Sequence, residues 1–182
     1  MDRQPHLEGD LVALRPLQPD DWDALFAIAS QREIWAMHPA HNRWQEPVFR
    51  AFFADALAQG GALAVIARAS GALIGSSRFQ GYDPAAGGSL EIGWTFLGQA
   101  YWGRGYNREM KRLMLAHAFT SVERVDFHVG EGNWRSRRAL ANIGAWLDES
   151  RTEDVDVPGI GTVRHLFYVI DRAGFAGGPL AA

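Results

Sequence analysis

The feature that most constrains this fold is a glycine-rich turn that joins an expected strand to an expected amphipathic helix. The strand covers residues 90–96, the turn covers 98–106, and the helix runs from about Asn107 to Thr120. Apolar residues recur along the helix at three- and four-residue steps, as a helix with one buried face requires. The chain must therefore leave a sheet and enter a packed helix through a turn that contains glycine.

This turn has the properties of an anion-binding site. The first backbone N–H groups of a helix have no partner within the helix and carry partial positive charge. Gly103 and Gly105 allow the backbone to approach a ligand closely, and Arg104 adds a formal charge. The segment predicts a site for phosphate or pyrophosphate, although a tight turn without a ligand has the same sequence signature.

Other nucleotide-binding loops fit this turn poorly. It lacks the Gly-Lys-Ser/Thr ending of a Walker-type loop. It also lacks a third glycine at the dinucleotide spacing, and its strand lies in mid-chain after a hairpin, which disfavours a Rossmann site. No magnesium-binding acid follows the turn at a suitable place, which disfavours an adenine-nucleotide sensor.

The remaining pattern predicts one domain, residues 1–182, of the mixed α/β (α+β) class. Asp20 is the expected N-cap of the first helix, and Ser70-Gly71 marks a hairpin. The Gly/Pro-rich residues 174–182 predict a mobile tail after an ordered core of about 7–173. In chain order the expected elements are a strand at 11–17, helices at 20–30 and 47–59, strands at 63–68, 73–79 and 90–96, a helix at 107–120, a strand at 122–129, a helix at 133–143, a turn at 155–161 and a strand at 163–170.

The composition excludes several classes of protein. The 182 residues include no cysteine, which excludes disulfides, thiolate zinc sites and a cysteine nucleophile. The net charge of -3 gives no electrostatic case for binding nucleic acid. No apolar stretch approaches the length of a membrane span and no secretory signal is visible, so we expect no membrane contact and a cytoplasmic location. His38 and His41 have no further ligand at metal spacing, so we expect no metal.

The order of these motifs resembles the GNAT N-acetyltransferase superfamily, and more narrowly the branch that contains the ribosomal-protein N-terminal alanine acetyltransferases. The resemblance covers nearly the whole chain and is more specific for the superfamily than for a substrate. It rests on residues 11–17, on Glu91-Ile92-Gly93, on the turn from Tyr101 to Glu109, on Asn133 to Leu140 and on Ile143-Gly144-Ala145.

The turn departs from the superfamily pattern Gln/Arg-x-x-Gly-x-Gly/Ala at two positions. Trp102 stands at the Gln/Arg place and Asn107 at the Gly/Ala place. An aromatic residue before the turn is usual in this branch, and Asn107 with Glu109 and Lys111 is similar to a sub-branch that reads Gly-x-Asn-x-Glu-x-Lys. These departures keep the pyrophosphate site, whose donors belong to the main chain, but weaken the transfer of ribosomal-protein specificity.

The resemblance implies a central, mostly antiparallel, twisted sheet flanked by helices, a GNAT-like fold that binds acyl-CoA. It implies acetyl-CoA as co-substrate. It also implies that Asn133 hydrogen-bonds the pantetheine or a neighbouring backbone group. The alternative is a purely structural role, in which Asn133 only caps its helix. The cofactor-binding residues expected on this basis are Ile92, Gly93, Trp94, Trp102, Gly103, Arg104, Gly105, Tyr106, Asn107 and Asn133.

The resemblance further implies roles in catalysis and in binding of the acceptor. Glu91 is the candidate base, acting directly or through water, and a solvated or structural glutamate is the alternative. Ser136 is the candidate proton donor to the sulfur. Trp35 and Trp44 lie in the irregular segment that helps to form the acceptor side in this family, and packing is the alternative role.

The sequence therefore predicts an N-acetyltransferase that transfers acetyl from acetyl-CoA to a primary amine by direct attack in a ternary complex. The acceptor is a protein N-terminus or a small amine, and the chain is a monomer or a homodimer. The alternative is a non-catalytic acyl-CoA-binding or regulatory module on the same fold, because a fold by itself does not fix a function.

Overall fold

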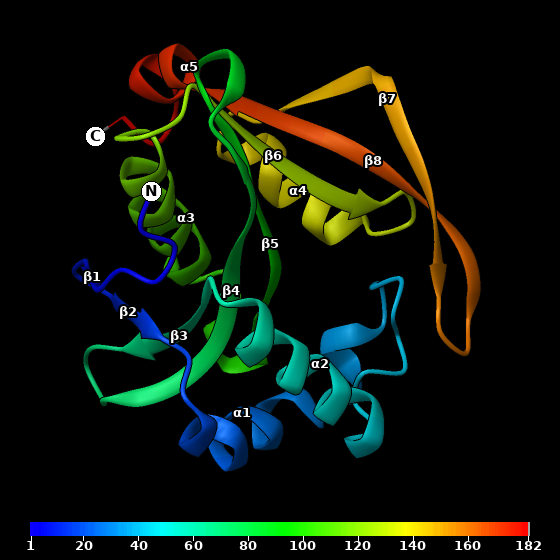
Figure 1. The fold of residues 1–182 in the computed structure, drawn as a ribbon. Coiled ribbons are helices and arrows are strands. Elements are labelled where there is room, and N and C mark those ends of the chain that lie inside the picture. Colours follow the sequence, from blue (N-terminus) through cyan, green and yellow to red (C-terminus); the bar gives the residue numbers. More distant parts are fainter. Residues whose placement is uncertain (182) are drawn as a thin grey trace.

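The chain folds around one twisted sheet of eight strands with helices on both faces (Figure 1). The structure is a computed structural model and describes residues 1–181. Within these described residues the strand order is β1-β2-β3-β4-β5-β6-β8-β7, and only the β5–β6 pair is parallel. The strands are β1 (Leu7–Glu8), β2 (Val12–Pro16), β3 (Ala62–Ala67), β4 (Ala72–Asp83), β5 (Ser89–Leu97), β6 (Arg124–Gly130), β7 (Trp146–Val157) and β8 (Gly161–Asp171); the helices are α1 (Trp22–Ala29), α2 (Glu46–Gln59), α3 (Tyr106–Ala118), α4 (Trp134–Asn142) and α5 (Arg172–Gly177). This arrangement confirms the mixed class and the mostly antiparallel sheet predicted from the sequence.

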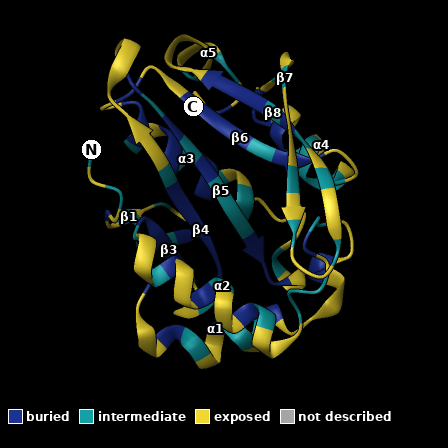
Figure 2. Cartoon of the chain, turned by 45° about the vertical axis from the view of Figure 1, so that its right-hand side comes forward, coloured by how far each residue is buried: buried dark blue, intermediate teal, exposed yellow. Residues whose placement is uncertain are grey.

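Two hydrophobic clusters cover the opposite faces of the sheet. Successive side chains of a strand point to opposite faces, and β3 illustrates this. Leu63 and Val65 join the cluster that includes the apolar residues of α3, whereas Ala62 and Ala64 join the cluster that includes those of α1 and α2. The central strands are accordingly buried on both sides, as the dark strands of Figure 2 show.

A β-bulge in β5 changes which residues point to each face. Ser76 pairs with Phe96 and Arg78 pairs with Gly93, so two residues of β5, Trp94 and Thr95, stand opposite one residue of β4. Trp94 has a φ of 53°, which non-glycine residues seldom adopt. Before the bulge Ile92 packs on the α3 side, and after it Phe96 packs on the α1–α2 side. The bulge therefore turns Thr95 toward α3.

The structure differs from the sequence prediction in several elements. Strands β1 and β7 were missed, and residues 155–157, expected in a turn, belong to β7. Strand β7 lies at the edge of the sheet and is largely exposed, so it lacks the buried–exposed alternation that identifies a strand. Asp20 is not the N-cap of α1, because the cap residue is Asp21. The carboxylate of Asp21 instead pairs with Arg15 at 2.6 Å.

Part of the segment 174–182, expected as a tail, is helical or packed, and Ala182 lies outside the described residues. Residues 172–177 form α5, and Leu180 belongs to the larger hydrophobic cluster. Arg108 of α3 donates a hydrogen bond to the carbonyl of Pro179. The segment is thus packed against the domain through residue 180. Within residues 1–181, no helix has the length and apolarity needed to cross a membrane.

Candidate active site

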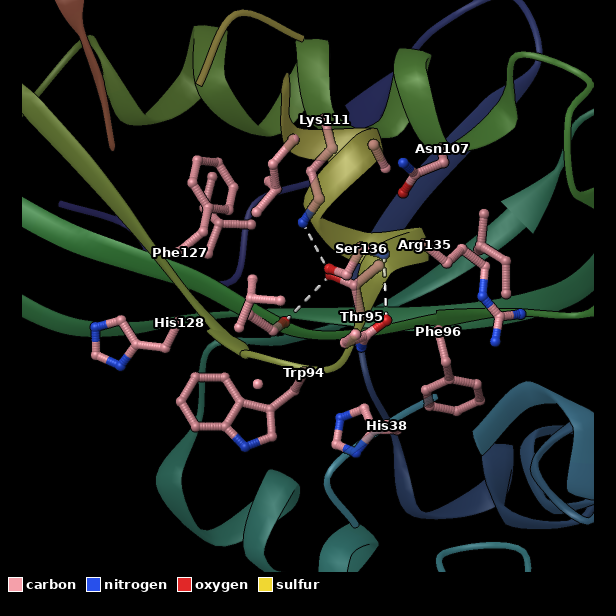
Figure 3. A pocket seen from close by; sticks show the side chains of 18 of the residues that line it. His38, Trp94, Thr95, Phe96, Asn107, Lys111, Phe127, His128, Arg135 and Ser136 are labelled. Carbon is pink, nitrogen blue, oxygen red and sulfur yellow. Dashed lines mark hydrogen bonds between the residues drawn. The ribbon is translucent and has the colours of Figure 1, made fainter. Parts of the chain in front are cut away.

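A cavity opens where β5 and β6 separate. The two strands pair only from Ser89 to Glu91 on β5 and from Arg124 to Asp126 on β6. Beyond these pairs they diverge, and a cavity of about 320 Å³ lies between the later residues of both strands. Helices α3 and α4 and the segment 34–39 complete its walls (Figure 3).

The glycine-rich turn forms one end of this cavity. Gly105 adopts a left-handed conformation with φ of 88° immediately before α3. The first backbone bond into α3 runs from Glu109 N to Gly105 O at 2.9 Å, which leaves the preceding amides at the helix start free for an anion. Trp102, Gly103 and Asn107 line the cavity. The structure therefore supplies the main-chain donors that a pyrophosphate group needs.

A stacked pair lies beside the turn. Trp102 Nε1 donates to the carbonyl of Leu97 at 2.8 Å, which fixes the indole. The guanidinium carbon of Arg135, from the first turn of α4, lies 4.1 Å from the centre of the Trp102 ring. Both residues line the cavity. They place a cation near the anion-binding turn.

Helix α4 contributes two of the expected residues. Asn133 Oδ1 accepts a hydrogen bond from Ser136 N at 3.2 Å, so Asn133 caps α4. Asn133 and Ser136 also both line the cavity. Capping is therefore shown for Asn133, and its position is compatible with a second role toward a ligand.

Glu91 belongs to the last pair that β5 forms with β6, next to the cavity. Its Oε2 atom is 3.4 Å from Nδ1 of His128. Burial, and after it the charge of Asp126, raises the pKa of Glu91 to about 7. His128 lines the cavity and packs on Phe167, with 4.2 Å between ring centroids. Burial also lowers the pKa of His128, so a neutral imidazole lies beside a carboxyl group that titrates near neutral pH.

Lys111 extends from α3 into the same cavity. Its Nζ donates to Thr95 Oγ1 at 2.8 Å, and Thr95 shares a second hydrogen bond of 2.8 Å with Ser77. The same Nζ lies 5.3 Å from the ring centre of Phe127. Burial lowers the pKa of Lys111 to about 7, although Glu91 acts in the opposite direction. This amine is therefore partly neutral at neutral pH.

The segment 34–39 forms the wall opposite α3. Trp35 lines the cavity, and its Nε1 donates to Ala29 O at 2.6 Å. His38 Nδ1 accepts from Ala40 N at 2.9 Å, so the ring proton of a neutral His38 lies on Nε2. Burial, and after it the charge of Arg43, keeps the pKa of His38 well below its usual value. His38 thus presents a neutral hydrogen-bonding group.

The cavity brings together most of the residues expected from the sequence. Those that line it are Trp35, Ile92, Gly93, Trp94, Trp102, Gly103, Asn107, Asn133 and Ser136. Arg104, Gly105 and Tyr106 belong to the turn but do not line the cavity, and Glu91 reaches it through His128. Trp44 lies elsewhere, packed against the α1–α2 cluster. Its expected acceptor role has no support from its position.

Sequence reasoning missed several polar residues that line the cavity, which are His38, Thr95, Lys111, His128 and His165. Lys111 entered only as part of a motif, while His38 and His128 were given no role in the site. Lys111 lies on the apolar side of α3 and His128 lies inside an apolar strand, and such polar interruptions of an apolar pattern are the signal that could have identified them.

Comparison with known proteins identifies the family. A family model described as an acetyltransferase (GNAT) domain matches residues 12–145. A putative acetyltransferase from T. thermophilus superposes with a TM-score of 0.77 at 27% identity, over 94% of this chain and 92% of that chain. No curated protein sequence matches significantly.

Two further solved structures share the fold at lower identity. Mycobacterium smegmatis RimJ in complex with CoA-disulfide gives a TM-score of 0.73 at 20% identity, over 97% of this chain and 90% of that chain. The ribosomal-protein-S5-alanine acetyltransferase from Vibrio fischeri gives 0.66 at 13%, over 92% and 97%. The sheet that opens between β5 and β6 and the glycine-rich turn before α3 thus belong to an acetyltransferase fold. The chain belongs to the GNAT acetyltransferase family, which confirms the resemblance found in the sequence.

Proposed function

We propose that this chain is an N-acetyltransferase that uses acetyl-CoA to acetylate a primary amine in a ternary complex. The observation that carries the proposal is the arrangement of the cavity. One end offers unpaired main-chain donors at Gly103 and the start of α3, and the other end offers His128 beside Glu91. A molecule with a pyrophosphate on one side and a reactive group on the other fits such a site, and acetyl-CoA has this form.

The residues at the α3 end would hold the co-substrate. Acetyl-CoA supplies an activated thioester, so the protein has to position it, take a proton from the amine and protonate the sulfur. The turn amides and Arg135 are suited to the phosphates. Asn133 lines the same cavity and its side-chain amide is suited to the pantetheine, and the Ser136 hydroxyl is the candidate proton donor to the sulfur.

The Glu91–His128 pair would accept the proton of the amine. A general base works best when its pKa lies near the operating pH. At pH 8 Glu91 is mostly ionised, since its pKa is about 7, and His128 is neutral. His128 is the member of the pair that lines the cavity, so it or a water beside it takes the proton first, with the Glu91 carboxylate 3.4 Å away.

The acceptor would enter from the side opposite α3. There the segment 34–39 faces the tip of the β7–β8 hairpin, and Asn42 Nδ2 donates to Pro158 O at 3.3 Å across the gap. Either a protein N-terminus or a small amine would reach the cavity from this side.

Two measurements test the proposal. Acetyl-CoA should raise the melting temperature in proportion to the logarithm of its concentration, because it binds only the folded state. An acceptor screen that detects released thiol should then find turnover with N-terminal peptides, amino acids or polyamines. Binding without turnover on any amine would favour the non-catalytic module, and failure to bind acetyl-CoA by calorimetry would refute both functions.

A further inference from the structure

Two arginines, Arg43 and Arg78, lie behind the part of the cavity wall that faces away from α3. The Arg78 side chain is 2% exposed, and its guanidinium carbon lies 4.8 Å from the centre of the Trp94 ring. The Arg43 guanidinium carbon lies 4.5 Å from the centre of Phe52, and that of Arg78 lies 5.8 Å from the same ring. Arg43 Nη1 is also 3.4 Å from His38 Nε2. Trp94 and His38 line the cavity, so each cation lies directly behind a residue of the cavity wall.

The positive charge of this pair is incompletely balanced. Arg78 Nη1 donates to Asp55 Oδ2 at 2.8 Å, but Arg78 Nε and Nη2 are buried without a hydrogen-bond partner. Asp55 is 50% exposed, and within residues 1–181 no other carboxylate forms an ion pair with Arg43 or Arg78. Burial and the nearby Arg78 lower the pKa of Arg43 to about 10. Buried polar groups in folded proteins nearly always have partners, so these two guanidinium nitrogens have N–H donors free for a ligand.

The sheet register relates these cations to the proposed base. Arg78 pairs with Gly93, and the neighbouring pair on the same face is Gln80 with Glu91. Two residues along a strand are separated by about 7 Å. An anion held by Arg78 therefore lies within the reach of a small molecule from the Glu91–His128 pair.

We infer that Arg43 and Arg78 bind a carboxylate of the acceptor, so that the acceptor is a small amine bearing a carboxylate, such as an amino acid. The inference rests on the proposed function and names its substrate class. A guanidinium group presents parallel N–H donors that match the two oxygens of a carboxylate. The Trp94 ring stacks on Arg78 on the cavity side, so binding of the carboxylate requires this ring to move aside. A polyamine, being cationic, is repelled from this wall.

The test compares amino acids with their carboxamides, which keep the amine and the side chain but lose the charge. The value of kcat/KM for the acid should exceed that for the amide by about 10- to 100-fold, as expected for loss of hydrogen bonds to a charged group. Each pair is measured at several pH values, because the amide also lowers the pKa of the amine. Calorimetry with the protein saturated with CoA measures binding of the same compounds without turnover.

Three variants separate recognition from packing. Arg78→Lys keeps a positive charge beside Asp55 but loses the parallel N–H donors of the guanidinium group. Arg43→Gln removes the second cation. Both should raise KM for the acid by about 10-fold or more and leave KM for the amide unchanged. Asp55→Asn removes the competing carboxylate and should lower KM for the acid. Arg50→Gln on the same helix as Asp55, an exposed arginine paired with Glu46, is the matched control.

The outcomes distinguish this inference from the proposed function. Equal kcat/KM for acid and amide, or variants that lower the melting temperature without changing the ratio, overturn the carboxylate site and leave the acetyltransferase intact. If no amine is acetylated, the proposed function fails. Calorimetry with the CoA-bound protein still tests the carboxylate site. Binding of the acid but not of the amide then supports the arginine site, and binding of neither overturns it. Because Arg43→Gln and Asp55→Asn alter less buried side chains than Arg78, the test does not depend on the folding of the Arg78 variant.

Discussion

Replacement of Glu91 by Gln tests the proposed base and the burial of its carboxyl group in one variant. Glutamine keeps the size and the polarity of the side chain but cannot take up a proton. If the Glu91 carboxylate is needed for proton uptake by the Glu91–His128 pair, kcat should fall by about 10²–10⁴-fold, the usual loss when a general base is removed. The affinity for acetyl-CoA should stay close to wild type, because Glu91 lies at the end of the cavity away from the glycine-rich turn.

The same change has a calculable effect on stability. The pKa of Glu91 rises from 4.5 to about 7 on folding, so the folded protein binds more protons between these pH values. The stability contributed by the protonated carboxyl is complete below pH 4.5 and is lost as the pH rises to about 7. This difference in pKa corresponds to about 3 kcal/mol. The free energy of unfolding of Glu91→Gln should therefore increase relative to wild type by about 3 kcal/mol between pH 4.5 and pH 8.

Urea unfolding at pH 4.5 and pH 8 and steady-state kinetics measure the two effects. Glu123→Gln is the control, since Glu123 is an exposed partner of Arg172 and should change neither quantity. Turnover within a few-fold of wild type would falsify the role as base. A relative stability that does not change with pH would show that Glu91 titrates normally and that the reasoning about its burial is wrong.

Three further predictions concern the rest of the cavity. Gly105→Asp should weaken acetyl-CoA binding more than Gly105→Ala does. Both variants strain a residue with φ of 88°, but only the aspartate repels a pyrophosphate. Equal losses of acetyl-CoA affinity by calorimetry would point to strain alone. Asn133→Asp should melt like wild type yet bind acetyl-CoA more weakly, whereas Asn133→Ala should lose about 1 kcal/mol of stability; unchanged affinity in the aspartate variant would leave Asn133 as a cap only. The free energy of unfolding of the wild type should fall as the pH is lowered from 10.5 to about 7, because protonation of Lys111 is disfavoured in the folded state. Lys111→Met should abolish that fall in urea titrations, and a fall that persists would assign it to other groups.

Local sequence patterns predicted the parts of the site that depend on neighbouring residues. The turn at Gly103 and Gly105, the helix after it and the Asn133 cap all appear where their residues predicted them. Helix starts, caps and glycine turns are governed by backbone geometry over a few residues, so a single sequence is sufficient to place them. The missed strand β7 shows the limit of this approach, because an exposed edge strand carries little hydrophobic pattern.

The chemistry of the cavity was decided by contacts between distant residues. Glu91 meets His128 only because β5 and β6 pair in parallel, and Lys111 meets Thr95 only because the bulge turns Thr95 toward α3. Likewise, the sequence identifies Arg78 as one arginine among many, and only the packing of β4 under Trp94 leaves two of its nitrogens buried and unpaired. Burial and neighbouring charges set the pKa of each group, and both depend on the assembled sheet. The sequence by itself thus determined the family and the anion-binding turn, while tertiary structure decided which side chains could act as base, donor or anchor.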